Sequence, residues 1–467
     1  MIYVITYILL GILLLMLLYL SFRIPALEDA KKEQGGEKIS ALLEHAQNMI
    51  YAGILLTLLA SVFCTWFFVR GTPWESHLME WLNIVVRVMH FTFGIAWIGA
   101  SFYFVFLENA LNRTEGVREE LAGNLWAIHG GGFYYLEKYK VAPAKIPKHL
   151  HWFKYEAYFT WISGISLLFI VYYFNASALM IDKNVLDIGP ASAIALGIGS
   201  FVIAWLIYDL LCRSVLIKYK IAFAITGLIL LTAFAWMYSM LFSARAAYIH
   251  FGAMIGSLMV ANVFFVIIPS QKAMVNAARL GKPVDPQKGK NALARSLHNN
   301  YFTLPVLFVM VSNHFPSTFG YRYPWLTLAL ITLGAAGIKH YLNLREKKQQ
   351  SYWVMPISAI ILLSAAFISA PDKNPEACKS KVSITEVMAI IQKRCSQCHS
   401  SRPTDDVYKV APNGVKYDTP DDLVKKKDLI MQRVVLTKTM PQNNKTNITE
   451  EERKLLRCWI EQGAGVN

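Results

Sequence analysis

The sequence predicts an all-α protein: a polytopic bundle of about ten transmembrane helices, followed by a small soluble domain. Two observations predict the bundle. Of the 467 residues, 55% are hydrophobic and only 16% are charged, whereas soluble proteins carry about 25% charged residues. The apolar residues also fall in runs of about twenty, long enough to cross a hydrocarbon layer of about 30 Å. This composition excludes a single water-soluble domain, a disordered chain and a small disulfide scaffold.

Charged segments separate ten apolar runs, and each run is expected to form one helix. The first run has no basic region before it and no small-residue cleavage site after it, so we interpret it as a retained anchor. Together with the second run it forms an addition (1–75) to a bundle of eight helices (76–371). The ten runs lie at about 1–22, 47–69, 80–107, 155–175, 189–211, 219–241, 247–269, 297–314, 323–343 and 352–370.

Loops on alternate sides of this bundle differ strongly in basic residues. The loops at 23–46, 108–154, 212–218, 270–296 and 343–351 hold 22 Lys and Arg, and the other loops hold four. Basic residues collect in cytoplasmic loops, so both termini are expected outside. This distribution accounts for the formal charge of +15 without a nucleic-acid partner. We expect a bacterial-type inner (cytoplasmic) membrane, with the residues after Pro371 on the periplasmic side.

The soluble tail contains Cys395-Ser396-Gln397-Cys398-His399, the C-x-x-C-H pattern of haem attachment. Two thiols on one helical turn add to the two vinyl groups of one porphyrin, and the next residue offers its imidazole to the iron. The alternative is a zinc or redox C-x-x-C site. Zinc needs a second pair of ligands, and the tail offers only Cys378 and Cys458 with no further His. One covalent haem c is therefore expected.

The surrounding residues fit a small class I c-type cytochrome domain at 378–467. A short amphipathic helix is expected at 383–394, and a capping box at 449–452 opens a final helix. Met440, before a proline in a loop, is the expected sixth iron ligand, because His and Met ligation suits an electron acceptor; Met431, inside an expected helix, is the alternative. Whether Cys378 and Cys458 form a disulfide stays open, because spacing does not show how closely their Cα atoms approach.

Ionisable residues within the expected spans are candidates for function, because charge is costly inside a membrane. One interpretation is two b-type haems, one held by an outer and one by an inner pair of histidines, with arginines near the propionates. Proton transfer by these histidines is equally supported. Taken singly, each is more simply a hydrogen-bonded bundle residue. The outer pair is His90 and His250 with Arg87 and Arg245, and the inner pair is His298 and His340.

The largest cytoplasmic loop, 108–154, combines glycine, aromatic and basic residues. Three successive glycines would let a ligand approach the backbone, aromatic rings could stack on a flat heterocycle, and basic groups could neutralise an anion. Such a segment could equally lie at the lipid interface. The residues alone therefore predict oxidation of an unidentified electron donor, with haem c taking the electrons.

Five stretches of the chain carry a resemblance to a known family. The chain resembles the membrane-integrated urate oxidases (urate hydroxylases), in which an eight-helix domain is fused to a cytochrome c. Together with the C-x-x-C-H tail, the stretches cover about residue 80 to the end; the first 75 residues depart from the eight-span pattern. The stretches are IAWIGASFYF (95–104), LWAIHGGGFY (125–134), HLHWFK (149–154), HNNYFTLP (298–305) and SNHFP (312–316).

The resemblance implies oxidation of urate to 5-hydroxyisourate, with electrons passed through the cytochrome to a respiratory acceptor and without hydrogen peroxide. Urate is a planar monoanion, and water attack on its oxidised ring needs a general base. We expect the loop to supply both functions. The expected bases are His129, His149 and His151, and the expected urate contacts are Gly131, Gly132, Phe133, Tyr134, Trp152 and Lys154.

Two other functions remain open at this point. One is a quinol-oxidising cytochrome b/c protein without a purine substrate. The other is a transporter or sensor whose cytochrome reports redox state. The side from which urate enters is also open, because an outer site near Arg87, His90 and Arg245 would shorten the route to haem c.

Overall fold

The computed structural model describes residues 9–21, 37–143, 145–147, 149–320, 323–370, 378 and 380–465. The chain divides into two compact units, Met1–Ile84 and Val85–Asn467. Each unit is described by itself below.

The first unit consists of apolar helices, one of them short. It holds a short helix, Leu9–Ser21, the helix α2 (Glu37–Val69) and the beginning of α3 (Pro73–Ala110). A Cβ added at Gly53 of α2 would lie 3.3 Å from the Leu17 side chain, so the short helix packs on α2 at this point. Most of the large apolar side chains of this unit are exposed, as expected where lipid takes the place of a protein core.

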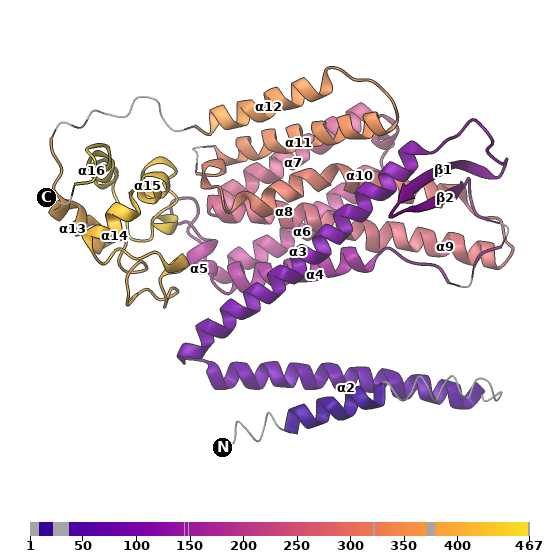
Figure 1. The fold of residues 1–467 in the computed structure, drawn as a ribbon, viewed down its shortest axis with the longest axis horizontal. Coiled ribbons are helices and arrows are strands. Elements are labelled where there is room, and N and C mark those ends of the chain that lie inside the picture. Colours follow the sequence, from indigo (N-terminus) through magenta and orange to yellow (C-terminus); the bar gives the residue numbers. More distant parts are fainter. Residues whose placement is uncertain are drawn as a thin grey trace. The chain divides into compact units, whose positions relative to one another are not determined.

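The second unit is a helical bundle joined to the tail (Figure 1). The π-helical turns η1 and η3 continue α4 and α8 without interrupting them. The helix α8 is the most buried of the set, and Tyr248, Phe251, Met254 and Ile255 of this helix are fully enclosed. The helices are α4 (Tyr155–Leu167), η1 (Leu168–Tyr173), α5 (Ala176–Leu179), α6 (Pro190–Arg213), α7 (Lys220–Leu241), α8 (Ala244–Ala261), η3 (Asn262–Ile267), α9 (Ile268–Arg279), α10 (Pro286–Ser312), α11 (Pro324–Glu346) and α12 (Val354–Ile368).

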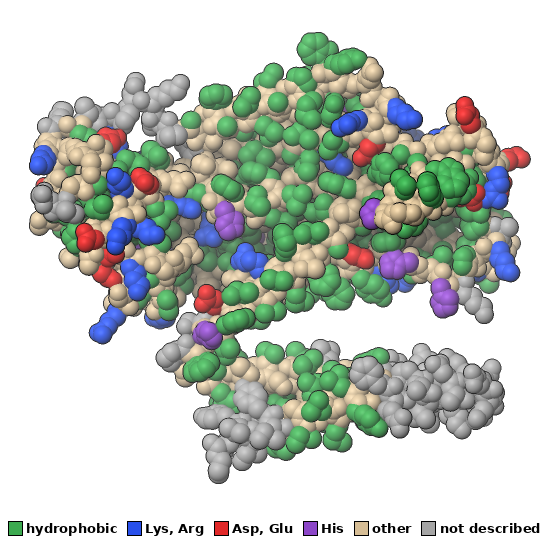
Figure 2. All heavy atoms as spheres, viewed as in Figure 1, with side chains coloured by type: hydrophobic (Ala, Val, Ile, Leu, Met, Phe, Trp, Pro, Cys, Tyr) green, Lys and Arg blue, Asp and Glu red, His purple; other side chains and the backbone are tan. Residues whose placement is uncertain are grey.

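The predicted apolar runs coincide with helices wherever the structure describes them. Among the described residues, seven helices are long and apolar enough to cross a membrane, and Leu9–Ser21 and Val354–Ile368 are apolar but shorter. The run at 297–314 lies in α10, whose first turns are polar. Figure 2 shows hydrophobic side chains over the middle of the bundle and charged ones toward its ends. An all-α fold is supported, and the number of spans stays a prediction.

The loop at 108–154 contains a β-hairpin, which the sequence analysis did not predict. Strands β1 (Leu121–His129) and β2 (Gly132–Tyr139) pair antiparallel, with His129 opposite Gly132. Gly130 and Gly131 form the turn with φ of 57° and 78°. A two-residue hairpin turn of this kind requires positive φ, which glycine adopts without strain. The turn alone therefore accounts for two of the three successive glycines.

The tail folds around its own core. It contains α13 (Ile384–Arg394), α14 (Pro420–Lys425), α15 (Lys427–Ile430), η6 (Met431–Leu436) and α16 (Glu450–Glu461). Val387 and Ile391 of α13 pack with Leu456 and Trp459 of α16 in one buried cluster. Both expected helices begin with a capping box, formed by Ser383 with Glu386 and by Thr449 with Glu452. Cys378 and Cys458 form a disulfide, which answers the question that spacing left open.

Candidate functional sites

The C-x-x-C-H sequence forms a tight turn directly after α13. The backbone N–H of Cys398 donates to the Cys395 carbonyl at 3.1 Å, and that of His399 donates to the same carbonyl at 2.9 Å. Both thiols are free, and Cys395 is buried whereas Cys398 is half-buried. The two sulfur atoms and the imidazole therefore leave the backbone within a single turn.

The His399 ring is fixed on one side only. Its Nδ1 lies 3.0 Å from the Val415 carbonyl, and its ring packs on Tyr417 with centroids 5.4 Å apart. A backbone bond at Nδ1 sets the tautomer that leaves Nε2 free to bind a metal. Among the described residues, no group of three or more His, Cys, Asp or Glu is arranged to chelate a metal ion. These residues suit a porphyrin iron, which needs few protein ligands, better than zinc.

The predicted sixth ligand lies in the same domain. The Met440 N–H donates to the Arg433 carbonyl at 3.0 Å, and its side chain packs on the cluster that contains Cys395. Met431 begins η6. Ligation by Met440 stays a prediction, supported by its place beside the core around Cys395.

The loop that carries Met440 contacts the end of the bundle. The Asn443 side-chain amide donates to the carbonyls of Ala178 and Ile181, at 2.8 and 2.9 Å. A Cβ added at Gly320 would collide with the Thr437 carbonyl, so the two backbones are in close contact. In Figure 1, α5 lies beside the tail at this end of the bundle. We call the contact made by these residues the tail seam.

Arg245 lies close to the tail seam. Its Nε donates to Asn313 Oδ1 at 3.3 Å, and the Asn313 amide donates to the Tyr172 hydroxyl at 3.1 Å. Burial, and then the charge of Arg245, lower the pKa of Arg433 on the tail. Arg433 is the residue whose carbonyl holds Met440, so a positively charged group of the bundle lies near the predicted ligand loop.

The outer histidines are enclosed by protein groups. His90 Nδ1 lies 2.9 Å from the Thr160 carbonyl and 3.2 Å from Ser163 Oγ. The His250 ring is fully buried among four aromatic rings whose centroids lie 4.6 to 6.1 Å away, and its Nε2 has no hydrogen-bond partner. The four rings are those of Tyr173, Phe201, Tyr238 and Phe242.

Of the inner histidines, His298 is half-buried and His340 is exposed. His298 stacks on Phe223 with centroids 4.9 Å apart, and its Nδ1 lies 2.8 Å from the Tyr208 hydroxyl. His340 Nδ1 lies 2.7 Å from the Tyr301 hydroxyl. Each of the four rings thus has a protein group at Nδ1, and a hydrogen-bonding or proton-transfer role fits this arrangement. Binding of a b-type haem by these histidines stays a prediction.

The residues expected to bind and oxidise urate lie in the loop at 108–154, most of them on its surface. His129 is exposed at the hairpin turn, and Phe133 and Tyr134 are 78% and 53% exposed. His149 and His151 are also exposed, and His151 packs edge-on against Phe153 with centroids 4.4 Å apart.

The remaining loop residues point to no common cavity. Lys154 Nζ lies 4.7 Å from the Tyr155 ring centroid, and Trp152 packs beside Ala157 and Val260. His151, Trp152 and Phe153 are neighbours in the chain, and the nine predicted residues line no common site. Their roles stay a prediction.

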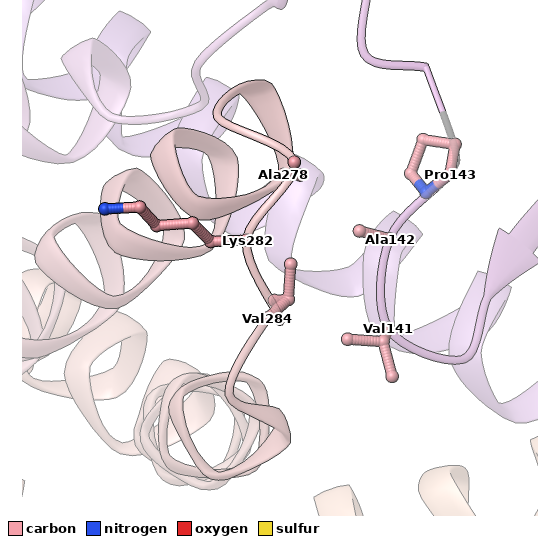
Figure 3. Close-up of a pocket in the computed structure, with 7 residues that line it drawn as sticks. Val141, Ala142, Pro143, Ala278, Lys282 and Val284 are labelled. Atoms are coloured by element: carbon pink, nitrogen blue, oxygen red, sulfur yellow. The ribbon is translucent and has the colours of Figure 1, made fainter.

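A shallow cleft of about 310 Å³ lies between the end of this loop and the turn from α9 to α10. Its lining is mostly small and apolar, and it holds none of the predicted site residues. Figure 3 shows the Lys282 ammonium extending away from Pro143. The lining residues are Val141, Ala142, Pro143, Ala278, Gly281, Lys282 and Val284.

Two buried polar clusters were missed from the sequence. Arg295 on α10 donates to Asp209 on α6 at 2.5 Å and to Asn262 Oδ1 at 3.1 Å. Lys339 on α11 is only 1% exposed, and its Nζ lies 3.8 Å from the Phe102 ring centroid. The available signal was a charged residue within an apolar run, which we applied only to Arg87, Arg245 and the histidines.

The fold and these sites define a bundle of long apolar helices joined to a domain that carries two free thiols and an imidazole on one turn. The chain belongs to the family described as urate oxidase N-terminal, whose profile matches residues 76–370. This match supports an oxidoreductase that acts on urate, and it covers the expected eight-helix domain. No curated protein and no solved structure matches the chain.

Proposed function

We propose that this protein is a membrane-bound urate oxidase that converts urate to 5-hydroxyisourate and passes the electrons to haem c at Cys395 and Cys398. The electrons leave for a respiratory acceptor, so hydrogen peroxide is not formed. The observation that carries the proposal is the tail seam: within a chain of the urate oxidase family, it holds the Met440 loop against the bundle. A redox domain fixed on the catalytic domain is what direct electron transfer requires.

The reaction balances without oxygen as a reactant. Urate and one water give 5-hydroxyisourate, two electrons and two protons. Bound haem c supplies one-electron acceptance, so the two electrons leave in succession. On the protein side, Cys395 and Cys398 would hold the porphyrin through thioether bonds, and His399 would present Nε2 while Val415 holds its other nitrogen.

Membrane insertion is supported by the helices and by the charges of the loops. Seven described helices are long and apolar enough to span, and the basic loops favour a tail on the periplasmic side. Covalent haem c is attached outside the cytoplasmic membrane, so this orientation agrees with the C-x-x-C-H motif.

The decisive experiment is anaerobic addition of urate to the purified, haem-loaded full chain while the α-band of haem c is recorded. Prompt reduction is expected, together with loss of the ultraviolet band of urate. Dithionite is added afterwards as a control, to show that the haem in the sample can be reduced. If urate leaves a dithionite-reducible haem oxidised, the proposal is wrong, and reduction by a quinol in the same sample then identifies a quinol-oxidising protein.

The proposed bases are tested separately. A base supplied by the loop predicts lower urate turnover in His129→Ala and His151→Ala, with His149→Ala as the third variant of the set; a urate site away from the loop predicts normal turnover in all three. His77→Ala, an exposed histidine of α3 outside the loop, is the matched control. Normal turnover in all three loop variants, with haem c still reduced, removes the loop from the catalytic machinery.

A further inference from the structure

Lys339 is a buried cation in contact with an aromatic ring, and the Glu346 carboxylate, two turns later on α11, acts on it from beyond ion-pair distance. Its side chain is 1% exposed, and its Nζ lies over Phe102 of α3 at 3.8 Å from the centroid. Within the described part of the chain, the ammonium forms no ion pair and no hydrogen bond. A buried charge whose acidic neighbour lies beyond ion-pair distance is costly, so the ammonium can still take an anion in direct contact.

Two asparagines on the same side of this site have unused polar atoms. Asn343 lies one turn after Lys339 on α11, and its amide donates to Asn300 Oδ1 of α10 at 3.0 Å. Both residues are buried, and Asn300 Nδ2 and Asn343 Oδ1 have no hydrogen-bond partner in the structure. The pair therefore offers one free donor beside one free acceptor, next to a cation.

The site has a lid of one side chain. Phe102 is half-buried, and α3 is fixed to α11 a few residues further on, where the Asn109 amide donates to Glu346 at 2.8 Å. Because the Phe102 ring lies on the ammonium, a ligand reaches the ammonium only when this ring moves aside. The Tyr301 hydroxyl and His340 Nδ1, 2.7 Å apart, join α10 to α11 beside it.

We infer that Lys339, Asn300, Asn343 and Phe102 form the binding site for the urate monoanion. Urate presents an N–H next to a C=O along its ring edges, which matches a free carbonyl next to a free amide. The ammonium neutralises its charge, and the aromatic ring stacks on its plane. This inference rests on the proposed function and gives it a substrate site inside the bundle, distinct from the exposed loop.

Binding is tested apart from turnover, on the full chain with haem c reduced beforehand by dithionite so that urate is not consumed. Equilibrium dialysis with radiolabelled urate gives Kd for the wild type, Lys339→Met, Asn343→Leu and Lys288→Gln. Lys288 is an exposed lysine at the start of α10 and is the matched control. Loss of a charge-assisted hydrogen bond predicts a Kd at least about tenfold weaker for the first two variants, and an unchanged Kd for the control.

A purely structural role for Lys339 predicts that Lys339→Met lowers the thermal midpoint. The binding role predicts the opposite, because replacing a buried cation that lacks an ion pair by an apolar side chain of similar length should leave the midpoint unchanged or raised. The rise in midpoint that urate gives the wild type should then be lost in the variant. Variants that bind urate like the wild type overturn the site. A lowered midpoint of Lys339→Met with its urate-induced rise retained does the same.

The two proposals fail in different ways. If urate reduces haem c in the wild type and Lys339→Met binds urate with normal Kd, the proposed function stands and the proposed site is wrong. If urate binding depends on Lys339 but urate does not reduce haem c, the proposed site stands and the proposed function is wrong. Absence of both binding and reduction overturns both.

Discussion

Among the described residues of the bundle, two cationic side chains are buried, and their surroundings differ. Arg295 is held by Asp209 and Asn262, and its guanidinium lies 5.0 Å from the Tyr208 ring centroid. Lys339 is as deeply buried, in contact with an aromatic ring and with the Glu346 carboxylate beyond ion-pair distance. A paired buried charge holds helices together, whereas an unpaired one is a cost that the empty protein bears. The comparison separates residues kept for the fold from residues kept for a ligand.

The largest effect is expected at the paired cluster. Asp209→Ala leaves Arg295 buried without its counter-ion and should lower the free energy of unfolding by about 3–5 kcal/mol. Lys339→Met should leave it unchanged or raise it. Denaturant unfolding in detergent measures both variants, and equal destabilisation of the two would end the distinction drawn between them.

A smaller effect is expected at the paired charges of the tail. Arg394 binds both carboxylate oxygens of Glu452, at 2.9 Å each. Burial would raise the pKa of Glu452, but Arg394 and the Thr449 N–H more than offset this and hold it below its ordinary value of 4.5. Glu452→Gln keeps the cap and loses the charge, at an expected cost of about 2 kcal/mol.

The same ion pair gives the tail a pH dependence of known sign. Because the folded pKa of Glu452 is lowered, its contribution to stability is complete above pH 4.5 and is lost as the pH falls through the lowered pKa. The stability of the tail, measured by circular dichroism as unfolding at a series of pH values, should therefore fall in acid for the wild type, and fall less for Glu452→Gln. A parallel pH profile for the two proteins would contradict this.

The tail seam is expected to contribute less. Asn443→Ala removes two hydrogen bonds to backbone carbonyls and should weaken docking by about 1–2 kcal/mol. Hydrogen exchange of the amides at 176–181 should become faster in this variant, while α13 and α16 keep their protection. Unchanged exchange at 176–181 would show that Asn443 does not hold the seam.

The smallest effect is expected at an exposed pair. Glu450 and Lys438 lie 2.7 Å apart, with side chains 67% and 52% exposed. Water and salt screen such a pair, so Lys438→Gln should leave the thermal midpoint of the tail unchanged within error. Lys438 is replaced because Glu450 also lies 3.7 Å from the buried Arg453. The variant is a control for Glu452→Gln, since each removes one charge of an ion pair made by the first turn of α16.

The helices and their first residues could be predicted because local sequence determines them. Apolar runs of about twenty residues predicted the helices, and the pattern at 449–452 predicted one capping box, whereas the box formed by Ser383 and Glu386 was not predicted. The hairpin was missed because the aromatic and glycine residues at 121–139 were interpreted as ligand contacts, although their alternation is also typical of paired strands.

The contacts that make the sites could not be read from the sequence. Asn443 binds carbonyl groups more than 260 positions away, and backbone acceptors have no sequence signal. Asn300 and Asn343 meet because α10 and α11 pack in one register. The disulfide stayed open for the same reason, until the Cα atoms of Cys378 and Cys458 were found 5.6 Å apart.

The short spacing between Met440 and Asn443 bears on how this protein should be studied. A C-terminal fragment made for convenient spectroscopy would lose the carbonyls of Ala178 and Ile181, and the neighbouring ligand loop would then move without its anchor. A midpoint potential recorded on such a fragment would describe an unanchored cytochrome. Measurements meant for the enzyme belong on the intact polypeptide.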